Sequence, residues 1–208
     1  TPPPPAMSDE SKSSALPMPV VDEATWLTKR KELLEKEKQL MKLKDEVSCA
    51  RRSLGMKKVS TDYVFQGVDG DVKLSELFGS HDQLIVVHFM FGPDWENPCS
   101  SCSLWADGYS SMLPHINRKA AFVVTAGAPV EKLQAALKRK NWTFPFLSAG
   151  ESTFRADFGV NFSAEDVAAR KPLYNYGRPF PSTEGPGYSV FYKDADGAVY
   201  HTFSTFAR

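Results

Sequence analysis

The stretch Leu84–Cys102, LIVVHFMFGPDWENPCSSC, decides the fold of this chain. It starts with an apolar run of the length of one buried strand, which breaks at Gly92-Pro93. Cys99-Ser100-Ser101-Cys102 follows at the expected start of a helix. A helix N-terminus has amide groups without partners and a partial positive charge, and both favour a thiolate. The pattern predicts a strand and a helix that together present a reactive Cys99, with Cys102 near enough to form a disulfide with it.

Composition and charge exclude several classes of protein. The 208 residues can bury one substantial core, and 42% of them are apolar. Basic and acidic residues number 25 each, and this balance gives no support to binding of nucleic acid or of an anionic membrane. No apolar run approaches the roughly 20 residues needed to cross a bilayer, and the N-terminus lacks the layout of a secretory signal. We therefore expect a soluble protein of the cytoplasm.

Cysteine usage favours redox chemistry over structural disulfides and metal binding. Cys49, Cys99 and Cys102 are too few, and odd in number, for a secreted domain stapled by disulfides. A zinc site would need two ligands besides Cys99 and Cys102, and the histidines are scattered. We expect no metal and no bound cofactor, and we expect Cys49 to take no part in the chemistry.

The N-terminal quarter divides into a tail and a helix. Residues 1–21 are rich in proline, serine and alanine, which predicts a disordered or extended tail. Residues 22–54 predict one long charged helix. Apolar residues recur in it every seven positions: Trp26, Leu33, Leu40, Val47 and Leu54. In the first interpretation this stripe packs on the globular domain of its own chain; in the alternative it is a coiled-coil arm that joins two copies in a homodimer.

From residue 55 onward short strands alternate with helices. Strands are expected at residues 63–65 and 68–72, a hairpin with an Asp-Gly turn, then at 84–91, 121–125 and 144–147, and in a last hairpin at 189–192 and 198–203. Short or long helices are expected at 74–78, 99–117, 129–140 and 152–158. In the second of these the spacing predicts burial of Leu104, Trp105, Tyr109, Met112 and Leu113. This order predicts an α/β fold, a mixed sheet with helices on both faces.

Several stretches carry a family resemblance. Residues 141–160, NWTFPFLSAGESTFRADFGV, resemble the peroxiredoxin pattern, and the last hairpin, SVFYKDADGAVYHTF, is similar to that of thioredoxin-like proteins. The chain from Trp26 onward resembles the thioredoxin-like family named domain of unknown function number eight-nine-nine. The motifs that carry this resemblance are HFMFGPDW (88–95), CSSCSLWAD (99–107), YNY (174–176) and the terminal YHTFSTFAR. The resemblance implies a thioredoxin-like domain at residues 55–208, and a fold rather than a reaction.

The two ends of the chain are typical of a fragment. The sequence begins with Thr1 rather than Met, and it stops at Arg208 directly after a strand-like run. We expect the domain to be truncated at its C-terminus.

The resemblance also implies roles around the cysteines. Cys99 is expected to attack a disulfide, and Cys102, one turn deeper, to resolve the mixed disulfide. His88 resembles the buried Asp of thioredoxins in position and would move a proton for the inner cysteine; the alternative is a core histidine bonded to backbone. Trp95 and Trp105 would form an apolar lip for the substrate, with core packing as the alternative, favoured for Trp105.

Two departures limit what the resembled families imply. Peroxiredoxins hold peroxide with a Thr or Ser three residues before the attacking cysteine and with an Arg from a distant strand. This chain has Glu96 at the first position and no Arg in the stretch 184–187. Thioredoxins present a cis-proline opposite the cysteines, and the alignment places Gly187 there with Pro186 one residue away. We expect Pro186 to contact the substrate.

Four functions remain open at this point. The first is a thiol–disulfide oxidoreductase that works on a disulfide-containing substrate with a thiol reductant as partner. The second is a thiol peroxidase in which Cys99 attacks peroxide. The third is a non-catalytic module that binds a partner or itself through the helix 22–54. The fourth is an enzyme for a small organic substrate, with the tryptophans, Tyr174 and Tyr176 lining a pocket.

Overall fold

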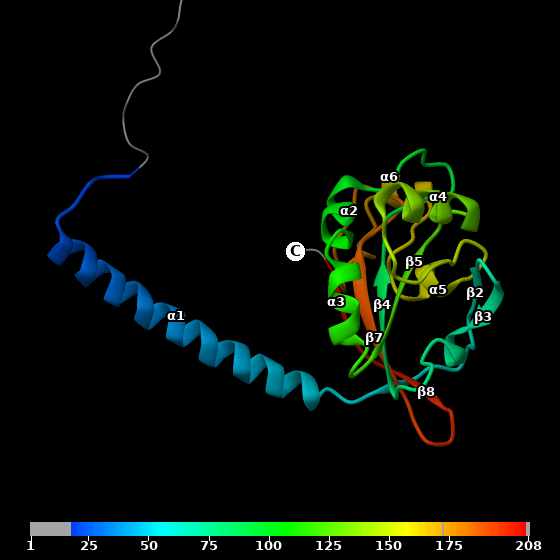
Figure 1. The fold of residues 1–208 in the computed structure, drawn as a ribbon, viewed down its shortest axis with the longest axis horizontal. Helices are drawn as coiled ribbons and strands as arrows, with labels where there is room; N and C mark the ends of the chain where they lie inside the picture. Colours follow the sequence, from blue (N-terminus) through cyan, green and yellow to red (C-terminus); the bar gives the residue numbers. More distant parts are fainter. Residues whose placement is uncertain (1–17, 172, 207–208) are drawn as a thin grey trace, which may run out of the picture. The chain divides into compact units, whose positions relative to one another are not determined.

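The computed structural model describes residues 18–171 and 173–206, in two units divided between Arg52 and Ser53. The first unit is one helix, α1 (Glu23–Arg52), labelled in Figure 1. It begins where Asp22 accepts hydrogen bonds from the amide and the hydroxyl of Thr25, both at 2.9 Å, which satisfies one free amide of the first turn. Most of the predicted tail, residues 1–17, lies outside the described residues.

The predicted helix is confirmed, and its apolar stripe is exposed. None of the residues of α1 is buried. The exposed fractions are 59% for Trp26, 50% for Leu33, 52% for Leu40 and 45% for Val47. Both interpretations of the stripe stay predictions. None of the helices in the described part of the chain is long and apolar enough to cross a membrane.

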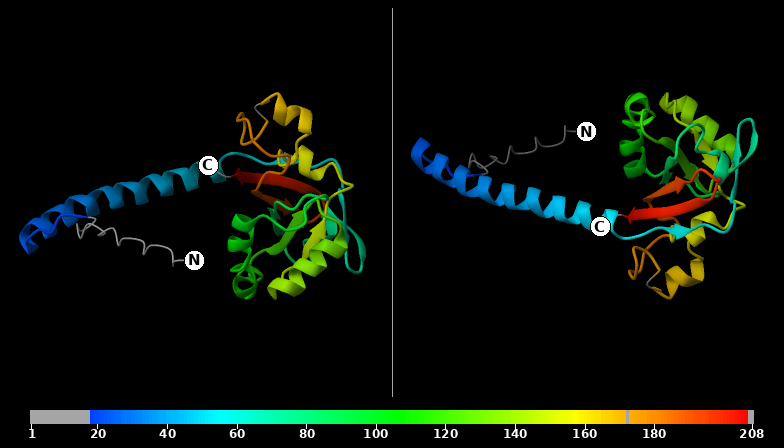
Figure 2. Two further views of the ribbon diagram at one scale, coloured as in Figure 1. Left: turned by 90° about the horizontal axis from the view of Figure 1, so that it is seen from above. Right: turned by 90° about the horizontal axis from the view of Figure 1, so that it is seen from below.

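The second unit is built on an eight-stranded sheet, and this sheet is mixed, as predicted. Its order is β1-β8-β7-β4-β5-β6-β2-β3 (Figures 1 and 2). The strands are β1 (Lys57–Lys58), β2 (Val64–Gly67), β3 (Gly70–Lys73), β4 (Gln83–His88), β5 (Ala121–Ala126), β6 (Phe146–Ser148), β7 (Gly187–Lys193) and β8 (Val199–Phe206). The apolar run of the opening stretch becomes β4, which pairs in parallel with β5 and antiparallel with β7. A strand in this central place is covered on both faces, which explains why it is apolar throughout.

Helices cover both faces of the sheet. They are the 3-10 helix η1 (Leu74–Glu76) and the α-helices α2 (Ser100–Ala106), α3 (Tyr109–Ile116), α4 (Val130–Lys140), α5 (Phe154–Asp157) and α6 (Ala164–Ala168). Figure 2 shows the green and yellow-green α2, α3 and α4 on one face and the yellow to orange α5 and α6 on the other. The sequence signals did not predict α6 or the two-residue β1.

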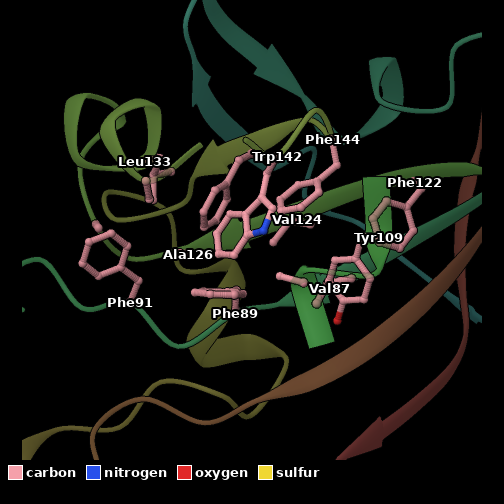
Figure 3. Packing of buried hydrophobic residues seen from close by; sticks show 14 of the residues in the cluster. Val87, Phe89, Phe91, Tyr109, Phe122, Val124, Ala126, Leu133, Trp142 and Phe144 are labelled. Atoms are coloured by element: carbon pink, nitrogen blue, oxygen red, sulfur yellow. The ribbon is translucent and has the colours of Figure 1, made fainter. Parts of the chain in front are cut away.

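Two core clusters lie on the two faces. The first core cluster packs under α2, α3 and α4, and Figure 3 shows its aromatic rings around Val87 and Val124. Its members include Val87, Phe89, Phe91, Tyr109, Leu113, Phe122, Val124, Leu133, Trp142, Phe144 and Phe146. The second core cluster packs under α5. Its members include Tyr63, Phe65, Leu74, Phe78, Leu84, Val86, Val123, Leu147, Phe154, Phe191 and Val199. Side chains alternate along β4, so Val87 and Phe89 enter one cluster and Leu84 and Val86 the other.

The prediction of one helix over residues 99–117 is wrong. The chain forms α2 and α3 instead, with a break at Asp107 and Gly108, because glycine is a weak helix former and the Asp107 carboxylate turns to accept the Trp142 indole N–H at 2.9 Å. The break shifts the buried face. Tyr109 and Leu113 are buried, as predicted. The prediction of burial is wrong for the other three residues, which are exposed: 73% for Leu104, 69% for Trp105 and 55% for Met112.

The first hairpin turns one residue earlier than predicted. Gly67 pairs with Gly70, so Val68 and Asp69 form the two-residue turn and Gly70 opens β3. Gly70 has a φ of +117°, which a residue with a side chain rarely adopts. The Asp-Gly signal therefore identified the hairpin but placed the turn wrongly.

Candidate active site at the Cys99–Cys102 pair

Cys99 lies where sheet gives way to helix, as the sequence predicts. It is the N-cap residue of α2, with a φ of −52° and a ψ of 128°, outside the helical range. Its amide donates to the carbonyl of Met90 at 3.1 Å, just beyond β4. Its own carbonyl accepts from the amide and the hydroxyl of Ser103, both at 2.9 Å. The backbone on each side is thus fixed, and the half-buried Cys99 thiol is free of any disulfide.

Cys102 lies one turn further and is held as a protonated thiol. It is half-buried against the first core cluster, and burial raises the pKa of its thiol to about 12, although the Met90 amide donates to its sulfur. Repulsion from the neighbouring Cys99 sulfur raises the pKa of Cys102 further. Cys102 therefore keeps its proton near pH 7, and Cys99, at the N-cap of α2, is the sulfur better placed to act as the nucleophile.

Both sulfurs lie in the wall of one pocket of about 580 Å³, called here the cysteine pocket. Its wall consists of the ends of β4, β7 and β8, the start of α2, and part of α3. The lining residues are Val87, His88, Phe89, Met90, Cys99, Ser101, Cys102, Trp105, Tyr109, Pro186, Gly187, Tyr188, Thr205 and Phe206. Most of this wall is apolar or aromatic, which suits an organic or peptide group beside the reactive sulfur.

The sequence favoured core packing for Trp105 and a place at the lip of the site for Trp95, and the structure shows the reverse. Trp105 lines the cysteine pocket with 69% of its surface exposed. Trp95 is absent from that lining and packs against the first core cluster, over Gly92, where an added Cβ would lie 3.0 Å from the indole. Lys132 fixes the same loop by donating to the carbonyls of Pro93 at 2.6 Å and Trp95 at 3.1 Å. The structure thus places Trp105 at the site and Trp95 in the supporting packing.

Pro186 lies in the pocket wall, as predicted, but its peptide bond is trans. No cis peptide bond occurs in residues 18–171 and 173–206. The Pro186 carbonyl accepts the Tyr174 hydroxyl at 2.6 Å, and this bond fixes the chain directly before β7. Pro186 therefore differs from the cis-proline of thioredoxins while lying opposite the cysteines in the same pocket.

His88 stands beside the cysteines, but its imidazole belongs to the other face of the sheet. Its Nε2 lies 2.7 Å from the Ser189 hydroxyl, and its ring packs on Phe154 at 5.5 Å, in the second core cluster. Burial, with added repulsion from Arg155 and His201, lowers the pKa of His88 to about 3. The imidazole is thus neutral near pH 7 rather than poised to titrate there, and its hydrogen bond goes to a side chain, not to backbone. Its role toward Cys102 stays a prediction.

Sequence reasoning missed two pairs of polar residues near the site. Tyr109 and Tyr188 share a hydrogen bond of 2.6 Å in the pocket wall, and burial raises the pKa of Tyr109. On the other face, Arg155 and Glu184 form a buried ion pair that Asn161 completes. Their partners lie 79 and 29 residues apart in sequence, so no local pattern could have paired them. Elsewhere in the described residues, no cluster of His, Cys, Asp or Glu could hold a metal ion.

Comparisons with known proteins identify a family and a fold. A family model described as "Bacterial protein of unknown function (DUF899)" matches residues 16–208. A search of curated proteins finds no match. Among solved structures, the bacterioferritin comigratory protein of Xanthomonas campestris, described for its alkyl peroxide reduction activity, has 12% identity and a TM-score of 0.51 over 73% of this chain and 85% of its own.

Two proteins of Mycobacterium tuberculosis are also similar. The peroxidoxin BcpB has 20% identity and a TM-score of 0.46, over 70% of this chain and 83% of its own. A secreted disulfide oxidoreductase has 17% identity and a TM-score of 0.40, over 71% of this chain and 87% of its own. At 12% identity, the similarity to the Xanthomonas protein establishes a thioredoxin-like fold of the peroxiredoxin kind, as predicted, and establishes nothing about the reaction.

Proposed function

We propose that this chain, which belongs to the bacterial family DUF899, is a thiol–disulfide oxidoreductase. One observation carries the proposal: Cys99 and Cys102 lie one turn apart at the start of α2, and both line one pocket of about 580 Å³. A site of this kind needs no bound cofactor. It needs a substrate with a disulfide and a partner thiol that reduces the enzyme again.

The reaction follows from the order of the two sulfurs. The Cys99 thiolate attacks one sulfur of a substrate disulfide, the substrate S–S bond breaks, and the departing thiolate takes up a proton. Cys102 then loses its proton and attacks the Cys99 sulfur, which releases the second substrate thiol and leaves a Cys99–Cys102 disulfide. One substrate disulfide becomes two thiols while the two cysteines lose two electrons. A thiol reductant returns those electrons by the same exchange.

The pocket wall suggests how the substrate is held. Trp105 offers a large exposed face in the same lining as Cys99, and Pro186 is a further apolar residue of that lining. The hydroxyls of Tyr109 and Tyr188 are bonded to each other, and the negative charge of a Cys102 thiolate would disfavour ionisation of Tyr109 further. Tyr109 therefore stays neutral, so it adds no negative charge to the surroundings of the inner sulfur.

The first test is to trap the mixed disulfide. In a Cys49→Ser background, Cys102→Ser treated with oxidised glutathione is expected to accumulate a protein with one glutathionyl group on Cys99, because the resolving thiol is absent. The parent with both site cysteines is expected to form the Cys99–Cys102 disulfide without lasting adduct. Intact mass spectrometry and peptide mapping distinguish these products.

Two outcomes would count against the proposal. Equal glutathionylation of Cys102 in Cys99→Ser and of Cys99 in Cys102→Ser would mean that the two sulfurs have no fixed order. Oxidation of Cys99 by hydrogen peroxide far faster than by any disulfide would favour the thiol peroxidase instead. Glu96 stands where peroxiredoxins have a Thr or Ser, and Arg155 is buried in an ion pair, so we expect slow reaction with peroxide.

The exposed stripe of α1 favours a second role, association of two copies. The helix carries apolar residues at heptad spacing and buries none of them, so a parallel second helix would remove the stripe from water. We expect the chain to sediment as a dimer and Leu33→Lys/Leu40→Lys to sediment as a monomer with unchanged thiol reactivity. Glu35→Lys, on the same helix outside the stripe, is the matched control. A monomeric parent at micromolar concentration would contradict this role.

A further inference from the structure

A second pocket, of about 550 Å³, lies on the face of the sheet that α5 covers. It is called here the lysine pocket. Its lining comes from four separate segments of the second unit: Lys57, Lys58, Val59, Ser60, Tyr63, Asp157, Phe158, Gly159, Leu173, Asn175, Tyr176, His201, Ser204 and Phe206. Phe206, near the end of β8, also lines the cysteine pocket, so the two pockets meet at this residue. The proposed thiol chemistry makes no use of the lysine pocket.

One wall of the lysine pocket is polar and fixed from inside the sheet. The His201 Nε2 lies 2.7 Å from the Ser204 hydroxyl, which lies 2.7 Å from the Ser189 hydroxyl. The Ser189 hydroxyl in turn lies 2.7 Å from the His88 Nε2, so four side chains of β4, β7 and β8 form one chain of hydrogen bonds. Ser204 is only 6% exposed, yet it lines the pocket. Buried polar groups in a sheet core are costly unless bonded. The chain bonds both serine hydroxyls and the Nε2 atoms of both histidines, leaves the His88 Nδ1 without a partner among the described residues, and gives the pocket a fixed polar surface.

The opposite wall is aromatic and is held by a strained backbone. Asn175 and Tyr176 follow each other with φ values of 47° and 60°, in the left-handed region that side chains disfavour. The ring of Tyr176 stands edge-on to Phe206 at 5.4 Å, and its hydroxyl donates to the Ser204 carbonyl at 3.2 Å. Tyr176 is nevertheless 80% exposed, so burial of its ring does not account for the strain. Backbone strain of this kind concentrates where a loop must present a side chain to a ligand.

One lysine of the pocket offers a positive charge to a ligand. Lys57 pairs with His201 across β1 and β8, is exposed, and forms no salt bridge within the described residues. Lys58 pairs with Tyr200, so its side chain points to the other face of the sheet, where Asp194 accepts the Tyr200 hydroxyl at 3.0 Å. The acidic residue of the lining, Asp157, accepts hydrogen bonds from the Tyr63 hydroxyl at 2.9 Å and the Thr153 hydroxyl at 2.7 Å. Its carboxylate is thus bonded to its own neighbours, whereas Lys57 remains available for an anion.

From these three walls we propose that the lysine pocket binds a small planar organic anion. The flat body of the ligand would lie against Tyr176 and Phe206, its anionic group would face Lys57, and polar atoms on its edge would meet His201 and Ser204. The volume suits a molecule of one or two fused rings. This assignment is independent of the chemistry at Cys99.

The test compares 2-naphthoate with 2-naphthamide, which have the same rings but differ in charge. Binding is followed by the quenching of naphthalene fluorescence and by isothermal titration. We expect saturable one-to-one binding of naphthoate, at least about tenfold tighter than that of naphthamide, because an ion pair near a protein surface contributes on that scale. Lys57→Gln is expected to remove the difference between the two ligands, and Tyr176→Ala to weaken both.

The control distinguishes the lysine pocket from the cysteine pocket. Trp105→Ala changes an exposed residue of the cysteine pocket and is expected to leave naphthoate binding unchanged. Tyr176 is also exposed at the surface, so neither variant should disturb the fold, which circular dichroism checks. The proposal is overturned by the absence of saturable binding up to about 10 mM, by equal affinity for the two ligands, or by binding that Trp105→Ala abolishes and Tyr176→Ala preserves.

Discussion

Cys99→Ser is expected to lower the rate of disulfide reduction at least about 10³-fold, to the rate of the uncatalysed exchange. The serine hydroxyl is not a nucleophile toward sulfur, and Cys102 cannot replace it because burial raises the pKa of its thiol to about 12. The measurement is steady-state reduction of a disulfide substrate with a thiol reductant in excess. Cys99 is half-buried and differs from serine by one atom, so the variant should fold and unfold as the parent does.

The matched variants make the Cys99 prediction specific. Cys49→Ser changes an exposed thiol on α1, and we expect no loss of rate. Cys102→Ser should keep the first attack, seen in a single turnover, and lose most of the steady-state rate because the mixed disulfide is no longer resolved from within. Retention of more than about a tenth of the parent rate by Cys99→Ser would show that the reaction passes through another group.

The place of Cys99 could be predicted because its signals are local. An apolar strand, the Gly92-Pro93 break and the start of a helix lie within one stretch of sequence. The structure contains all three in that order. The sheet with helices on both faces followed from the same kind of local alternation. The prediction needed no knowledge of which segments meet in space.

The predictions for His88 and the two tryptophans depended on which way each side chain points. A sequence indicates the direction of a side chain less clearly than it indicates a strand or a helix. His88 has the same parity along β4 as Leu84 and Val86, so its imidazole points to the second core cluster and away from Cys102. That parity was available from the sequence. The break at Gly108 was a weaker signal, and it turns Trp105 outward into the pocket wall.

The contacts that no local pattern predicts are those between distant segments. The lysine pocket draws its lining from residues 57–63, 157–159, 173–176 and 201–206, and the tyrosine pair joins α3 to β7. Such sites depend on sheet order, and here β8 lies between β1 and β7 at one edge of the sheet. A single sequence predicts where the strands are but not which strands lie next to each other in the sheet. These sites could therefore be found only in the structure.

Glu184→Gln is expected to lower the free energy of unfolding by about 3–5 kcal/mol, the largest effect on stability that we expect from one substitution. Glu184 is 1% exposed and Arg155 is 3% exposed. The Arg155 Nη1 donates to one carboxylate oxygen at 3.0 Å, Nη2 donates to the other, and Asn161 adds a hydrogen bond at 3.0 Å. Glutamine keeps the shape but removes the charge, which leaves a buried guanidinium without compensation. Urea unfolding followed by circular dichroism measures the change.

The double variant Arg155→Met/Glu184→Leu decides whether the uncompensated charge is the cause. Removal of both charges with similar volume is expected to recover most of the lost stability, because burying an ion pair costs about as much as its attraction returns. A double-mutant cycle then gives a coupling energy well above the few tenths of a kcal/mol typical of independent sites. Additive losses in the two single variants would instead mean that each side chain stabilises the fold by packing alone.

Because Glu184 precedes Pro186 and β7 directly, Glu184→Gln should also slow glutathionylation of Cys99, whereas the double variant should restore it.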